Sequence, residues 1–491
     1  MKNFMRPTTI MLLASCVLLL ADSGLAQKKL AAKPEVVSDV AMEVRGYRTR
    51  VREMIRTSLK RGQAYEHLRE MCEKVPKRVS GSPGAAAAVL WAKQLMERLE
   101  FDNVHLEEVM VPHWEPGTKP SLAVTVPANA SATKLPFTPL GGSVPTPLEG
   151  ITAEVMEVQS IGELRKREKE AKGKIVFFNR PMDMTLLSTG QAYGGAVRQR
   201  TRGAAEAGAV GAVAVIVRSV SSRRDDAPHT GAMNYQDGVK KIPAGAVSML
   251  GADRLSALLK KQKKVQICLK LDSKWYKDEL SYNVVGELTG SEKPEEILVV
   301  GGHLDAWSTG DGAHDDGAGC MHSVEALRLI KEMGYRPKRT IRCVLFMNEE
   351  NGLRGGRAYY KAHLDEMDKH VLALESDSGG FTPRGFTTDA HKEAKVVLEE
   401  IAQLLVNAGA GKVYAGGGGA DISPMRASGV LMMGYRPDSH RYFDLHHSKH
   451  DVFSSVNERE IELGSACIAT MLFIVADLKE TLKHNPIPAK K

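Results

Sequence analysis

The second half of the chain alternates apolar, strand-like runs with helix-like segments, and no other feature of the sequence constrains the fold as strongly. Five runs lie from Asn283 onward: NVVGEL, EILVVGG, TIRCVLFMN, HVLALES and VLMMGY. Helical spacing occupies residues near 317–332, 355–363, 392–407 and 458–482. Continuous apolar strands that alternate with helices are typical of a parallel sheet buried on both faces. The sequence therefore predicts an α/β fold with a mostly parallel central sheet.

Histidine and acidic residues follow three of these strands in succession. His303 and Asp305 follow EILVVGG, Glu349 and Glu350 follow TIRCVLFMN, and Asp377 follows HVLALES. Ligands of open α/β sheets bind where loops leave the carboxyl ends of the strands, so these side chains should lie together. Histidine and carboxylates without cysteine are typical of a catalytic rather than a structural zinc site. We therefore expect a metal site at this edge of the sheet.

The spacing of the candidates indicates how they divide the work. Side chains alternate along a strand end, so His303 and Asp305 point to the same side, and we expect Asp305 to accept the second ring N–H of His303. Adjacent carboxylates near a dication are costly for structure alone, so one of Glu349 and Glu350 can bind metal while the other acts as a general base. Asp315, in the run GAHDDGAG, lies where a tight turn enters a helix and can bridge two metals through its two oxygens.

The pieces HLDAW, GAHDDGAG, NEENG, ESDSGG and HHSKHD, in that order and at that spacing, resemble the secreted co-catalytic zinc aminopeptidases. The resemblance extends upstream to SGSPG and VPHWEPG and covers nearly the whole chain after its first residues. It implies a three-layer zinc-exopeptidase fold, also described as phosphorylase/hydrolase-like. The intervening segment resembles a protease-associated domain through GKIVFFNR and EAGAVGAVAVI, so we expect a mainly-β insert.

The resemblance also implies a role for each candidate residue. Glu349 becomes the general base, and Asp305 becomes the residue that orients His303. The implied ligands of two zinc ions, with Asp315 bridging, are His303, Asp315, Glu350, Asp377 and His447.

His447 is preferred to His446 and His450 because of the family's spacing of histidine, serine or threonine, two residues and aspartate. Here that spacing ends at Asp451. The family often has threonine next, where this chain has Val452.

The implied reaction is hydrolysis of the amino-terminal bond of dipeptides or short peptides by a metal-activated water, and the implied assembly is a homodimer. Asp421 and Tyr442 are candidates for substrate contact. One alternative is a carboxypeptidase of the glutamate carboxypeptidase type, which needs a basic pocket. Another is a non-catalytic binding protein on the same fold, which the intact ligand set argues against. Arginines available for the basic pocket are Arg426, Arg436 and Arg441.

The beginning of the chain indicates export. Lys2 and Arg6 precede an apolar run that ends in small residues near Ala26, which is typical of a secretory signal peptide. The run LASC would also suit a lipoprotein with Cys16 lipidated, but the apolar run continues through Leu20. No later stretch is long and apolar enough to span a bilayer, so we expect a secreted or periplasmic protein without a membrane anchor.

The net charge of +8 does not indicate nucleic-acid binding, because basic and acidic residues are interleaved along the chain. The predicted organisation is a signal peptide (1–26), the first part of a peptidase domain (27–130), the insert (131–275), the second part with the metal site (276–485) and a tail (486–491). The insert carries no cluster with metal-ligand spacing, so we expect it to take no part in catalysis.

Overall fold

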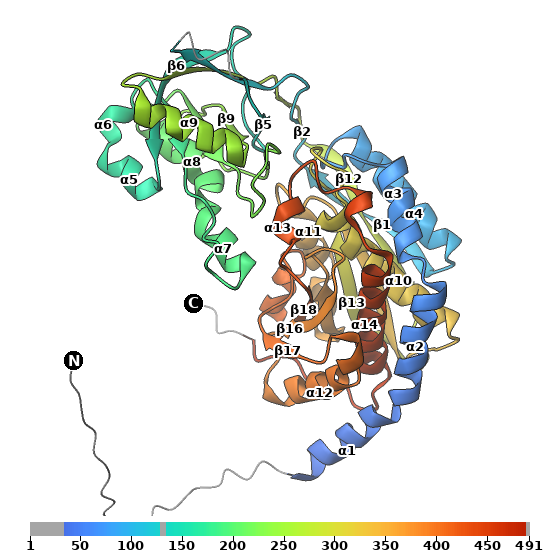
Figure 1. Ribbon diagram of the computed structural model, residues 1–491. Helices are drawn as coiled ribbons and strands as arrows, with labels where there is room; N and C mark the ends of the chain where they lie inside the picture. The colour runs from blue at the N-terminus through green and yellow to red at the C-terminus, as the bar shows by residue number, and fades with distance from the viewer. Residues whose placement is uncertain (1–33, 128–133, 488–491) are drawn as a thin grey trace, which may run out of the picture.

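The computed structural model describes residues 34–127 and 134–487, which form a large body with a smaller one beside it (Figure 1). The predicted signal peptide and Cys16 lie outside the described residues. Among the described residues, no helix combines the length and the apolar character needed to cross a membrane.

The large body is built on an eight-stranded sheet in the order β1-β12-β14-β13-β15-β18-β16-β17. The four strands β14, β13, β15 and β18 are mutually parallel, while β1 and β12 form an antiparallel edge. This confirms the expected α/β fold with a mostly parallel centre. The strands are β1 (Asp102–Val111), β12 (Glu279–Leu288), β13 (Lys293–His303), β14 (Arg339–Phe346), β15 (His370–Glu375), β16 (Pro383–Thr388), β17 (Val413–Ala415) and β18 (Leu431–Pro437).

Helices cover both faces of this sheet and give it three layers. Along β13, Leu298 and Val300 belong to the apolar core under helices α10 and α14, whereas Ile297 and Val299 belong to the core under α11. This alternation is why the strand is apolar throughout. The helices are α1 (Pro34–Gly46), α2 (Arg48–Arg61), α3 (Ala64–Lys74), α4 (Pro83–Arg98), α10 (Ala318–Glu332), α11 (Arg354–Ala362), α12 (Lys392–Gln403), α13 (Tyr442–Leu445) and α14 (Glu458–Asp477). Short helical turns are η1 (Ala313–Gly317), η2 (Leu364–Lys369), η3 (Val406–Ala408), η4 (Ser423–Ser428) and η5 (Phe453–Ser455).

The small body has a second eight-stranded sheet, in the order β4-β3-β10-β6-β7-β8-β9-β5. Its strands β6, β7, β8 and β9 are parallel, and parallel neighbours need crossover connections. Helices provide the connections from β6 to β7 and from β7 to β8, whereas residues 219–243 connect β8 to β9 without a helix. The insert is therefore α/β, which differs from the mainly-β expectation. Its strands are β3 (Ser121–Val126), β4 (Lys134–Leu135), β5 (Phe137–Pro139), β6 (Ile151–Val158), β7 (Ile175–Phe178), β8 (Ala214–Arg218), β9 (Ala244–Val247) and β10 (Gln266–Lys270), and its helices are α5 (Ile161–Lys166), α6 (Glu168–Ala171), α7 (Thr189–Ala196), α8 (Arg198–Ala209) and α9 (Met249–Lys261).

A two-stranded ribbon joins the two bodies. It consists of β2 (Trp114–Glu115), just before the second sheet, and β11 (Lys274–Trp275), just after it. Trp114 pairs with Trp275 across the ribbon. The domain boundaries stay a prediction, although β3 already belongs to the second sheet ahead of the expected start at residue 131.

Candidate metal centre

The carboxyl ends of β14, β13 and β15 lie side by side and carry the candidate ligands, as the sequence indicates. His303 is the last residue of β13 and pairs in register with Phe346 of β14, and Gly301 pairs with Glu375 of β15. His303, Asp315 and His447 are all buried. The fold therefore brings together His303 at the end of β13 and His447, which follows α13 much later in the chain.

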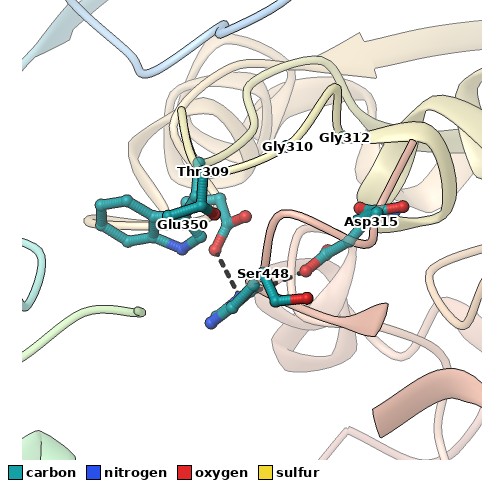
Figure 2. Close-up of a pocket in the computed structure, with 9 residues that line it drawn as sticks. Thr309, Gly310, Gly312, Asp315, Glu350 and Ser448 are labelled. Carbon is teal, nitrogen blue, oxygen red and sulfur yellow. Dashed lines mark hydrogen bonds and ion pairs between the residues drawn. The ribbon is translucent and has the colours of Figure 1, made fainter. Parts of the chain in front are cut away.

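Asp315 lies between two histidines and faces each with a different oxygen. Its Oδ1 is 3.3 Å from His303 Nε2, and its Oδ2 is 3.2 Å from His447 Nε2. His303 Nε2 is also 3.7 Å from Asp377 Oδ1, and His447 Nε2 is 3.0 Å from Glu350 Oε2. In Figure 2 the side chains of Glu350 and Asp315 converge on one space. The five residues thus form two ligand groups that share Asp315.

The polar atoms of this cluster suit metal ions. His303 Nε2, Asp315 Oδ2 and Glu350 Oε1 are buried without a hydrogen-bond partner among the described residues. Burial alone lowers the pKa of His447, but the neighbouring Glu350 and Asp315 raise it to about 10. Burial likewise opposes the charged form of His303, yet contacts with Asp315 and Asp377 raise its pKa well above the usual value. The anionic pocket therefore stabilises positive charge, which divalent metals supply more strongly than protons do.

Two neighbouring residues could be mistaken for ligands. Asp316 lies near His303 and Asp377, but its two oxygens accept the backbone N–H groups of His303 (3.0 Å) and Gly319 (3.1 Å). His446 Nε2 is 3.6 Å from Asp315 Oδ2, whereas His447 reaches both Asp315 and Glu350. The geometry therefore favours His447 as the ligand.

The carboxylate of Asp305 holds the loop that carries Glu349 and Glu350. Its carboxylate accepts the backbone N–H groups of Asn348 (2.7 Å), Glu349 (3.0 Å) and Glu350 (3.3 Å). The ring Nδ1 of His303 is 2.9 Å from the Asp305 carbonyl oxygen and 3.9 Å from its carboxylate. The expected carboxylate–imidazole hydrogen bond is thus replaced by one to the carbonyl, because the carboxylate satisfies three backbone donors.

Other residues, to which the sequence analysis assigned no role, hold the centre in place. Asp451 accepts the backbone N–H groups of His314 (2.6 Å) and Asp315 (3.1 Å), which fixes the bridging residue. The family's spacing in HHSKHD, which ends at Asp451, could have pointed to this residue. Gly302 is required because a Cβ atom there would lie 2.3 Å from Asp316 Oδ2. His447 has a φ of 61°, a conformation that non-glycine residues rarely adopt outside constrained sites.

Glu349 faces the same space without belonging to either ligand group. It lines the cavity above the centre, and burial raises its pKa well above the usual value, with Asp377 and Glu350 adding repulsion. Bound cations would reverse this effect and favour its ionised form. Glu349 is therefore suited to exchange protons.

A cavity of about 490 Å³ opens onto the metal centre, and both bodies line it. From the insert come Tyr193, Arg200, Ala232 and Asn234. The insert, which we expected to take no part in catalysis, thus forms one wall of this cavity. The sequence could not reveal this wall, because the residues that form it come from separate segments without a shared motif.

The two candidate residues for substrate contact differ in their position relative to the cavity. Tyr442 lines the cavity, whereas Asp421 is fully buried and is not among the described residues that line it, so a direct contact of Asp421 with substrate is not supported. The arginines considered for a basic pocket are engaged elsewhere: Arg426 with Asp389, Arg441 with Glu460 and Arg436 over the Tyr414 ring.

An α/β sheet with histidine and carboxylates at its carboxyl edge defines a metallohydrolase. Comparison with known proteins identifies the family, because residues 283–472 match Peptidase family M28. Carboxypeptidase Q of Mus musculus is 37% identical over 471 residues, which is 95% of this chain and 98% of that protein. Carboxypeptidase Q of Homo sapiens is 38% identical over 423 residues, covering 86% of this chain and 87% of that protein. The chain belongs to peptidase family M28 and is a metallopeptidase, as the ordered motifs indicated.

Solved structures of related proteins share the fold of this chain. The Peptidase M28 precursor from Shewanella amazonensis SB2B has a TM-score of 0.86 at 33% identity and covers 91% of this chain and 100% of its own. BSAP, a zinc aminopeptidase from Bacillus subtilis, shares the fold with a TM-score of 0.62 at 18% identity, covering 86% of this chain and 96% of its own. The zinc-exopeptidase fold expected from the resemblance is confirmed.

Proposed function

We propose that this protein is an exported dinuclear zinc exopeptidase that removes the amino-terminal residue of dipeptides or short peptides. The observation that carries the proposal is the contact of Asp315 with two histidines through two different oxygens, at 3.3 and 3.2 Å. A single metal would not need such a shared carboxylate. Zinc is favoured by ligands that are histidine and carboxylate without cysteine.

Each ligand group would hold one ion. One group is His303, Asp315 and Asp377, and the other is His447, Asp315 and Glu350. Bound zinc supplies Lewis acidity toward the scissile carbonyl and lowers the pKa of water to near neutrality. Asp305 and Asp451 keep the ligand loops in place through their backbone hydrogen bonds.

Glu349 is the proposed general base. It takes a proton from the attacking water and passes it to the departing amine. Its neighbour Glu350 contacts His447 and acts as a ligand, so the two adjacent glutamates have different tasks. The free amino group of the peptide would be anchored, as a neutral amine, by the ion held in part by Asp377, which lines the cavity.

A carboxypeptidase is the second candidate, and the name of the relatives, carboxypeptidase Q, favours it. The two activities cut the same bond in a dipeptide and differ only for longer peptides.

A homodimer and export through the amino-terminal signal peptide are also part of the proposal. Sedimentation equilibrium and the amino terminus of the exported protein test these two points.

The function is tested with purified protein, free dipeptides and their N-acetylated and C-amidated forms. Chelation is expected to abolish hydrolysis, and zinc or cobalt is expected to restore it. Elemental analysis is expected to give two zinc ions per chain. Full activity in metal-free protein overturns the proposal, and cleavage of N-acetylated tripeptides only at the last bond favours the carboxypeptidase.

A further inference from the structure

We infer that Thr230 of the insert is a positioning residue for the metal ligand His447, and that the ion of the His447 group is held tightly only while the insert contacts the large body. Thr230 lies in the segment that connects β8 to β9. It would touch neither substrate nor metal and would act through the imidazole of His447. The inference rests on the proposed function, because it assigns the insert a task at one of two ions.

His447 lacks the support that the main sheet gives to His303. His303 ends β13 and pairs in register with Phe346 of the neighbouring strand β14. His447 instead lies between the four-residue helix α13 and the short turn η5, and its φ of 61° is one that non-glycine residues rarely adopt. Such a conformation persists only where its surroundings hold it. The loop of His447 therefore needs contacts from outside itself.

Thr230 provides two of these contacts. Its backbone N–H donates to the His447 carbonyl oxygen at 2.9 Å, and its own carbonyl oxygen lies 3.3 Å from His447 Nδ1. Arg200 Nη1 is also 3.3 Å from Nδ1, but a guanidinium only donates. Among the described residues, the Thr230 carbonyl oxygen is thus the acceptor within hydrogen-bond distance of Nδ1.

This hydrogen bond sets the tautomer that metal binding requires. A histidine ligand usually donates the N–H of one ring nitrogen to a carbonyl or carboxylate, which leaves the other nitrogen for the metal. With Nδ1–H donated to Thr230, Nε2 keeps its lone pair, and it lies 3.2 Å from Asp315 Oδ2 and 3.0 Å from Glu350 Oε2. Thr230 therefore orients the ring and determines which nitrogen can bind the ion.

The insert holds Thr230 firmly against His447. Thr230 is 3% exposed, and its Oγ1 donates to the Pro139 carbonyl oxygen at 2.7 Å. The next residue, Gly231, has a φ of 127°, and its carbonyl oxygen accepts the N–H of Gly141 at 3.0 Å. A Cβ atom at Gly231 would lie 2.5 Å from His447 Nδ1, so glycine is required for this close approach of the insert to the ligand.

Further contacts attach the loop of His447 to the insert on both sides of the ligand. Before it, Ser222 Oγ donates to Asp444 Oδ1 at 2.7 Å. After it, His450 Nε2 lies 2.7 Å from Asp225 Oδ2, and both side chains are 24% exposed. Figure 1 shows α7 of the insert reaching toward α13, which precedes this loop. The insert therefore contacts the loop before, at and after the ligand.

The two ions should consequently differ in their dependence on the insert. His303 Nδ1 contacts the Asp305 carbonyl oxygen at 2.9 Å, and Asp377 follows β15, so this ligand group is held by the large body. A movement of the insert away from the large body would remove Thr230 from His447 and leave His303 unchanged. Metal occupancy of the His447 group would then report whether the insert is in contact.

The test measures zinc binding to the full chain rather than turnover. Zinc-loaded protein is equilibrated at graded concentrations of free zinc set by a chelator, and bound zinc is determined by elemental analysis. In Thr230→Pro the N–H that reaches His447 is absent. We expect the ion of the His447 group to be bound about 10–100-fold more weakly, which is the usual effect of losing the partner of a histidine ligand, and the other ion to be unchanged.

Two aspartates of the insert give a matched pair of variants. Asp225 contacts His450 of the large body, whereas Asp226 pairs with Arg254 and Ser248 within the insert. Asp225→Ala should weaken the same ion as Thr230→Pro, by a smaller factor, and Asp226→Ala should bind zinc as wild type does. This pair decides the question if calorimetric unfolding shows that Thr230→Pro does not fold.

The identity of the weakened ion is checked with His447→Ala. That variant should lose the same ion, and the addition of Thr230→Pro should cause no further loss. Equal weakening of both ions would assign Thr230 a general structural role and overturn the inference. Wild-type binding of both ions in Thr230→Pro and Asp225→Ala would also overturn it.

The wild-type protein separates this inference from the proposed function. Two zinc ions without hydrolysis would overturn the exopeptidase and leave the inference intact. A single zinc ion would overturn the dinuclear proposal. The inference would survive that result only if His447→Ala and Thr230→Pro both weaken the single ion, and it would be overturned otherwise.

Discussion

The two sheets place polar residues at the carboxyl ends of parallel strands in different ways. In the second sheet these residues satisfy one another: Arg218 donates to Asn179 (2.6 Å) and pairs with Asp253 (2.6 Å). In the main sheet, His303, Asp315 and Glu350 retain buried atoms without hydrogen-bond partners among the described residues. Both sheets follow the same topological rule, so polar strand ends alone do not identify a site. The metal centre is distinguished by several unsatisfied polar atoms that converge on Asp315.

The largest expected effect concerns the two neighbouring glutamates of the main sheet. Glu349→Gln should lower kcat by at least about 10²–10⁴-fold, because an amide of the same shape cannot take the proton. Its zinc content should stay that of wild type. Glu350→Gln should lower zinc content as well as rate, because it weakens a ligand. Elemental analysis beside kcat checks both, and an exchange of the two metal contents would show that the roles are reversed.

The next effect concerns the polar network of the second sheet. Arg218→Met should lower the free energy of unfolding by about 1–3 kcal/mol, because Asn179 Oδ1 loses its buried donor and Asp253 keeps only the exposed Arg224 among the described residues. Zinc content should not change, since no ligand contacts this network. Calorimetric unfolding together with elemental analysis provides the measurement. Loss of zinc in this variant would mean that the two sheets are not as independent as their hydrogen bonds indicate.

A buried acid of the main body gives a pH-dependent effect. Burial and then Glu325 raise the pKa of Glu462 to about 8. A carboxyl whose folded pKa exceeds its unfolded value binds more protons when folded, so its contribution to stability falls as pH rises from about 4.5 to 8. Glu462→Gln should therefore raise the midpoint of thermal unfolding at pH 8 by a few degrees and change it little at pH 4. The opposite sign would show that Ser58 and Tyr65 stabilise the ionised form.

The smallest effect is expected at the surface of the insert. Arg224 is 71% exposed in its side chain and pairs with Asp253. Exposed ion pairs contribute about 0–1 kcal/mol, so Arg224→Glu should leave kcat within about twofold and zinc content unchanged. A large loss of turnover would extend the catalytic role of the insert beyond the cavity wall.

Much of the large body could be predicted from the sequence, because its signals are local. The apolar runs predict the strands, and His303, Glu350 and Asp377 each lie at or within a few residues of a strand end. Asp315 lies further along, in the turn η1 that precedes α10. The contact of Asp305 with three backbone N–H groups was not predictable, because loop donors carry no side-chain signature. The proximity of Arg200 to His447 was not predictable either, since it depends on how the insert meets the large body.

The ribbon of β2 and β11 has a consequence for how such a molecule can be assembled from parts. Glu115 pairs with Lys274 and Trp114 pairs with Trp275, so the chain enters and leaves the insert at neighbouring positions. Directly opposed residues of an antiparallel pair lie about 5 Å apart, a distance that a two-residue turn closes. The segment between β2 and β11 could therefore be gained or lost as one unit without a change in the strand order of the main sheet.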